Sequence, residues 1–97
     1  MIVERPEKRR GPRIQTALPV FLKNTQGITR DVSATGVYFW TSESVCALGE
    51  LISLAVKLER PAGTMLLKCR GDVVRTESSG GTFGVAVKIA ESVMELA

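Results

Sequence analysis

The sequence has 97 residues, 44% of them hydrophobic and 24% charged, a composition that fits one globular domain with a single core. No apolar run reaches the roughly 18 to 20 residues of a membrane span, and the polar N-terminus lacks the apolar segment of a secretion signal, so a cytoplasmic protein with no membrane insertion is expected. The absence of histidine removes the commonest general base and imidazole ligand, and we expect neither an enzyme nor a metal site.

The net charge of +3 comes entirely from the first 13 residues, because the charges of the remaining 84 balance. This segment holds five basic and two acidic residues: Arg5, Lys8, Arg9, Arg10, Arg13, Glu4 and Glu7. We expect residues 1–13 to form a mobile basic arm, since like charges and little apolar surface disfavour packing, and residues 14–97 to form the folded domain. A basic arm on a neutral body indicates an anionic partner, whether a nucleotide, a nucleic acid or an acidic lipid, although short charged tails are commonly just solvated.

From Ile14 onward, apolar residues alternate with polar ones in short runs separated by turns, which is typical of β-strands. Pro19 in the first run suggests an edge strand or a bulge. Six consecutive strands with short connections favour an antiparallel barrel, because closing the sheet buries one face and removes exposed edges. The expected strands cover 14–23, 28–32, 37–41, 52–58, 67–73 and 83–89.

The end of the chain has a different pattern. Ser92 is followed three residues later by Glu95, which is a capping-box signature. A short C-terminal helical turn is therefore expected after the last strand.

The cysteines and the neighbouring aromatic residues are expected to be structural. Cys46 and Cys69 have no metal-ligand or redox spacing, so buried free thiols are expected. Tyr38 and Trp40 are interpreted as barrel packing rather than as platforms for nucleotide bases.

Two separated motifs carry most of the functional information. The first is Arg9-Arg10-Gly11-Pro12-Arg13, and the second is Asp31-Val32-Ser33-Ala34-Thr35-Gly36, between the second and third expected strands. Their order and spacing resemble the signature of the PilZ family, bacterial receptors of cyclic di-GMP, in which Arg-x-x-x-Arg precedes Asp/Asn-x-Ser-x-x-Gly. Gly71-Asp72-Val73-Val74-Arg75 and Gly84-Val85-Ala86-Val87 look like later strands of the same family, so the resemblance covers nearly the whole chain.

The resemblance implies a PilZ-type β-barrel that binds cyclic di-GMP without any other cofactor. The resemblance assigns ligand binding to Arg9 and Arg13, and Arg10 is a third candidate contact. A guanidinium pairs with phosphate, contacts guanine O6 and N7, and stacks on bases. Asp31 can accept hydrogen bonds from guanine N1–H and N2–H2, and Ser33 can bind phosphate. Alternatively, both side chains can cap the turn by hydrogen bonds to the nearby backbone. Gly36 would allow close approach of the ligand or supply a positive φ.

The resemblance also implies a switch, in which the arm becomes ordered over the ligand and presents a new surface to a partner protein or neighbouring domain. Two alternatives remain. One is a PilZ-like protein-interaction module without nucleotide binding. The other is a barrel that binds single-stranded nucleic acid, which the neutral charge of the body disfavours.

Overall fold

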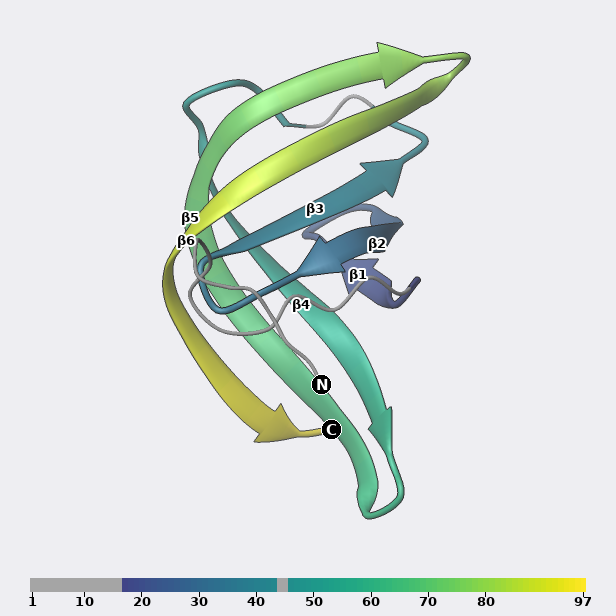
Figure 1. Cartoon of the computed structure of the whole chain (residues 1–97), viewed down its shortest axis with the longest axis vertical. Helices are drawn as coiled ribbons and strands as arrows, with labels where there is room; N and C mark the ends of the chain where they lie inside the picture. The colour runs from purple at the N-terminus through teal and green to yellow at the C-terminus, as the bar shows by residue number, and fades with distance from the viewer. Residues whose placement is uncertain (1–16, 44–45) are drawn as a thin grey trace, which may run out of the picture.

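The computed structural model describes residues 17–43 and 46–97, which form a closed antiparallel barrel of six strands (Figure 1). The strands are β1 (Pro19–Phe21), β2 (Gln26–Val32), β3 (Gly36–Thr41), β4 (Leu51–Arg60), β5 (Gly63–Ser79) and β6 (Thr82–Leu96). Their order around the barrel is β1-β2-β3-β6-β5-β4. The predicted six-stranded antiparallel barrel is thus confirmed. Among the described residues, no helix is long and apolar enough to cross a membrane.

The core is built from the alternating residues that the sequence pattern predicts. Side chains that are almost completely buried come from four strands: Val20, Phe39, Val56 and Val73. Full burial of one such side chain contributes about 1.5–3 kcal/mol. Cys69 is buried in the same cluster, Cys46 is partly buried beside it, and both thiols are free. Burial raises the pKa of both thiols.

Pro19 does not mark an edge or a bulge. It is the first residue of β1, which pairs with β2 on one side and with β4 on the other, without a register shift. The start of a strand accommodates a proline, which has no backbone N–H to donate. The edge or bulge predicted from Pro19 is therefore wrong.

The expected C-terminal helical turn is absent, because the end of the chain continues β6. Residues 91–96 pair with 65–70 of β5, and this ladder supplies the backbone hydrogen bonds that a helix would otherwise provide. Glu95, the predicted capping residue, forms an ion pair with Lys68 at 3.1 Å, and Glu91 pairs with Arg70 at 3.6 Å. Cross-strand pairing therefore overrides the local helix signal.

The long β5 and β6 strands form a hairpin that projects beyond the barrel (Figure 1). Gly80 and Gly81 make its turn with φ values of 55° and 89°. A two-residue hairpin turn with positive φ suits the right-handed twist of the strands, and glycine adopts that conformation without strain. The division into residues 1–13 and 14–97 stays a prediction, since residues 1–16 lie outside the described part.

Candidate functional site

The turn between β2 and β3 is held by the hydroxyl group of Ser33. Its Oγ accepts hydrogen bonds from the backbone N–H of Thr35 at 3.3 Å and of Gly36 at 3.2 Å. The backbone N–H of Ser33 donates to the carbonyl of Gly36 at 2.9 Å, which closes the corner. Ser33 therefore has the turn-holding role that was one of its two expected functions.

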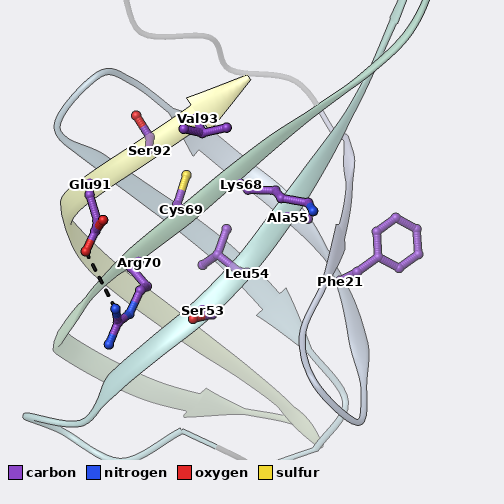
Figure 2. Close-up of a pocket in the computed structure, with 10 residues that line it drawn as sticks. All are labelled: Phe21, Ser53, Leu54, Ala55, Lys68, Cys69, Arg70, Glu91, Ser92 and Val93. Carbon is purple, nitrogen blue, oxygen red and sulfur yellow. Dashed lines mark ion pairs between the residues drawn. The ribbon is translucent and has the colours of Figure 1, made fainter. Parts of the chain in front are cut away.

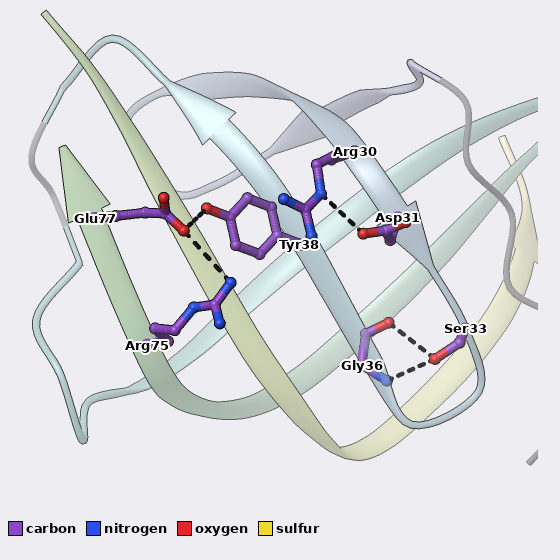
Figure 3. Close-up of polar contacts among 7 residues, drawn as sticks. All are labelled: Arg30, Asp31, Ser33, Gly36, Tyr38, Arg75 and Glu77. Carbon is purple, nitrogen blue, oxygen red and sulfur yellow. Dashed lines mark hydrogen bonds and ion pairs between the residues drawn. The ribbon is translucent and has the colours of Figure 1, made fainter. Parts of the chain in front are cut away.

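A β-bulge in β2 sets the direction of the two residues before this turn. The register passes from Thr29 opposite Phe39 directly to Asp31 opposite Tyr38, so Arg30 is the additional residue. A bulge changes the direction in which side chains project. Arg30 and Asp31 consequently lie side by side on the outer face, where Arg30 Nε donates to Asp31 Oδ2 at 3.0 Å (Figure 3).

Tyr38 lies on the outer face of β3, since its neighbours Val37 and Phe39 belong to the core. It is nevertheless buried, because other side chains cover it. The Arg30 guanidinium lies 4.1 Å from the centroid of its ring and the Arg75 guanidinium 5.6 Å from it (Figure 3). The Tyr38 hydroxyl donates a hydrogen bond to Glu77 Oε2, which Arg75 also contacts at 3.4 Å.

Small residues in β6 make this cluster possible. Ala86 and Gly84 lie in β6 between β3 and β5, opposite Tyr38 and Trp40 on one side and Arg75 and Glu77 on the other. A Cβ on Gly84 would overlap the Tyr38 hydroxyl and lie 2.9 Å from Cζ3 of Trp40. Because Gly84 and Ala86 have small side chains or none, Arg75 and Glu77 can reach Tyr38 across β6.

Burial raises the pKa of Tyr38 above its ordinary value of 10, and the Glu77 carboxylate raises it further. The phenol is therefore neutral at physiological pH and can donate to Glu77. The cluster of Arg30, Asp31, Arg75 and Glu77 contains two positive and two negative side chains, so it has no net charge of its own. A dianionic ligand bound here would need positive charge from elsewhere in the chain.

The structure brings three of the predicted site residues together at one corner of the barrel: Asp31, Ser33 and Gly36 (Figure 3). Gly36 does not have the positive φ considered for it, since the glycines of the described segments with positive φ are Gly49, Gly63, Gly80 and Gly81. A Cβ on Gly36 would lie 3.1 Å from the Val87 carbonyl oxygen, so glycine here allows close packing of β3 on β6. Arg9, Arg10 and Arg13 lie outside the described residues.

Sequence reasoning missed Arg30, Arg75 and Glu77, and it interpreted Tyr38 as barrel packing. Arg30 precedes the motif aspartate directly, but in a regular strand adjacent residues face opposite sides, so nothing indicated that they would meet. Arg75 and Glu77 reach the site only through the pairing of β5 with β6 and of β6 with β3. The alternation of Tyr38 with core residues was the one available signal that its ring faces outward.

An apolar groove of about 390 Å³ lies elsewhere on the molecule (Figure 2). Its lining comes from β1, β4, β5 and the last part of β6 and includes Phe21, Leu54, Cys69 and Val93, but no residue of the Asp31–Gly36 turn. The turn and the Tyr38 cluster are thus separate from this groove. Among the residues that the structure describes, no group of three histidine, cysteine or acidic side chains could hold a metal ion.

The family model of the PilZ domain matches residues 7–95, which include both motifs and all six strands except Leu96, the last residue of β6. The chain belongs to the PilZ family. PilZ domains are binding and adaptor domains, and as a family they are generally receptors for cyclic di-GMP.

A solved structure supports the same fold. The PilZ domain is similar to the Bacillus subtilis inhibitor of motility, MotI/DgrA, with a TM-score of 0.78 and 17% sequence identity over 93% of this chain. It covers 46% of MotI/DgrA, so it spans about half the length of that protein. At this identity the likeness extends to the fold alone. No curated protein sequence matches the chain.

Proposed function

We propose that this PilZ domain is a receptor for cyclic di-GMP that uses Arg9, Arg10 and Arg13 together with the corner formed by Asp31, Ser33 and Gly36. The observation that carries the proposal is the outward position of Asp31, beside a turn whose shape Ser33 fixes. A carboxylate there is suited to the two donors on the Watson–Crick edge of guanine. The family signature joins five positions in one site, and the chain has all of them: Arg9, Arg13, Asp31, Ser33 and Gly36.

The charge distribution supports a contribution from the N-terminal segment. The described cluster is neutral, whereas residues 1–13 have a net charge of +3. Arg13 is five residues before Leu18, so it can be at most about 18 Å from it. Leu18 in turn exchanges backbone and side-chain hydrogen bonds with Thr29, which directly precedes Arg30 and Asp31. Arg13 can therefore reach a ligand at this corner.

The proposed output is a change in how the N-terminal segment presents itself to another protein or domain. Arginines that bind the phosphates would order this segment against the barrel, and the resulting surface would differ from that of the free protein. The description of MotI/DgrA as an inhibitor of motility supports an adaptor role in a protein of the same fold.

Titration calorimetry with cyclic di-GMP tests the proposal, with GTP and cyclic GMP as ligand controls. Arg13→Ala should weaken binding by roughly ten- to a hundredfold, since a hydrogen bond to a charged group contributes about 1.5–3 kcal/mol. Arg5→Ala removes a positive charge outside the motif and is the matched control. Selective binding that Arg13→Ala reduces and Arg5→Ala preserves would support the receptor. No heat and no thermal shift would favour the protein-interaction module instead.

A further inference from the structure

We propose that Arg30, stacked on Tyr38, forms a flat platform on which one guanine of the bound dinucleotide stacks. This inference rests on the proposed function and adds to it a contact that the two sequence motifs do not include. It assigns Arg30 a direct role at the ligand and Tyr38 a supporting role beneath it.

The position of Arg30 is suited to such a contact. The guanidinium carbon of Arg30 lies over the Tyr38 ring, 4.1 Å from its centroid, and the Arg30 side chain is 51% exposed. The neighbouring Asp31 side chain is only 11% exposed and accepts from Arg30 Nε. Two contacts therefore hold the plane of the guanidinium, while much of the group stays open to solvent beside the predicted guanine-binding carboxylate.

Tyr38 is itself fixed, so the platform is preorganised. Its hydroxyl is hydrogen-bonded to Glu77, and the Trp40 ring contacts it in a T-shaped arrangement with 5.6 Å between centroids. Gly84 leaves room for the phenol on the β6 side. A long arginine side chain ordinarily loses rotamer freedom when it binds a ligand. Here that loss has largely occurred in the free protein, which favours binding.

The chemistry of the platform fits a purine base. A guanidinium is planar and weakly hydrated, and it stacks on aromatic rings through both dispersion and cation–π attraction. The Nε–H group of Arg30 donates to Asp31, and the terminal nitrogens of Arg30 can donate to an adjacent phosphate. Cyclic di-GMP has two guanines, so one base can stack on Arg30 while a base edge donates to Asp31.

Two substitutions separate stacking from simple charge attraction. Arg30→Lys keeps the positive charge but removes the plane, and Arg30→Ala removes both. Arg70→Ala is the matched control, because Arg70 is 54% exposed, forms a comparable surface ion pair with Glu91 and does not belong to the Tyr38 cluster. Calorimetry with cyclic di-GMP should give a loss of about 5- to 100-fold for both Arg30 variants, as for removal of one base-stacking side chain. Arg70→Ala should bind like the wild type.

A second measurement detects the stacking directly. In NMR spectra, the Nε–Hε resonance of Arg30, assigned by its disappearance in Arg30→Ala, should shift when cyclic di-GMP is added because of the ring current of the base. The corresponding resonance of Arg70 should not move. Full affinity in Arg30→Lys, an equal loss in Arg70→Ala, or an unmoved Arg30 resonance would each overturn the platform while leaving the receptor function in place. If the wild-type protein itself does not bind cyclic di-GMP, the proposed function fails, and the platform fails with it.

Discussion

The Tyr38 hydroxyl donates a hydrogen bond to Glu77, a residue 39 positions further along the chain. This contact joins β3 to β5 across the outer face of β6, over Gly84 and Ala86. It fixes the ring on which Arg30 rests, and so it connects the β5–β6 hairpin with the residues beside the Asp31–Gly36 turn. The outer face of the barrel beside the Asp31–Gly36 turn is therefore stabilised by residues far from the motifs in sequence.

Tyr38→Phe should destabilise the fold by about 1 kcal/mol at neutral pH, since it removes one hydrogen bond to a carboxylate but keeps the ring. The substitution should also change how the free energy of unfolding depends on pH. The pKa of Tyr38 is raised in the folded protein. Its neutral phenol therefore contributes fully to stability below the unfolded pKa of about 10, and this contribution is lost as the pH rises from there through the folded pKa. Above about pH 10, urea denaturation should show a steeper loss of stability with rising pH in the wild type than in Tyr38→Phe. Parallel losses in the two proteins would contradict the raised pKa.

Gly84→Ala should destabilise the protein by about 1–3 kcal/mol, because the added Cβ overlaps the Tyr38 hydroxyl and approaches Trp40 in a packed region. Chemical denaturation measures the effect. In the double variant with Tyr38→Phe, the hydroxyl is no longer present, so the combined loss should be smaller than the sum of the two single losses. Additive losses would mean that the overlap with the hydroxyl does not determine the cost.

Ser33→Ala should reduce the stability of the fold, through the turn, more than it reduces the affinity for the ligand. The substitution removes the acceptor for the backbone N–H groups of Thr35 and Gly36, and we expect a loss of about 1 kcal/mol in denaturation experiments. Ser78→Ala, at an exposed position in β5, is the control and should be neutral. An unchanged stability in Ser33→Ala would show that the turn does not depend on its hydroxyl.

Asp31→Asn should weaken cyclic di-GMP binding by about tenfold or more, because an amide presents one acceptor oxygen in place of a charged carboxylate to the guanine donors. The size of the side chain is preserved, so its position in the bulge should be maintained. Glu95→Gln removes a negative charge at an ion pair with Lys68 and is the charge-matched control. Calorimetry measures the affinity of both variants for cyclic di-GMP, and Glu95→Gln should bind like the wild type. Equal affinity in Asp31→Asn and the wild type would remove Asp31 from the site.

The local pattern of the sequence was sufficient for the strands and for the inward faces of the barrel. Alternation of apolar and polar residues in runs such as 52–58 reflects a geometric property of every strand, so it can be recognised without knowing the partners. The hairpin turn at Gly80 and Gly81 is likewise a local feature, since the positive φ that glycine permits depends on no distant residue. The two motifs likewise identified the family and the corner at Asp31, Ser33 and Gly36.

Only the tertiary structure decided which side chains meet on the outer face. Alternation alone would direct Arg30 and Asp31 to opposite sides, and it is the bulge in the pairing of β2 with β3 that brings them together. Pairing with β5 likewise made residues 91–96 a strand despite their capping signature. The pairing of β3 with β6 and of β6 with β5 also brings Arg75 and Glu77 over Tyr38, which they partly cover. Each of these outcomes depends on hydrogen-bond register between segments distant in the chain, and register is a non-local property that no short window of sequence contains.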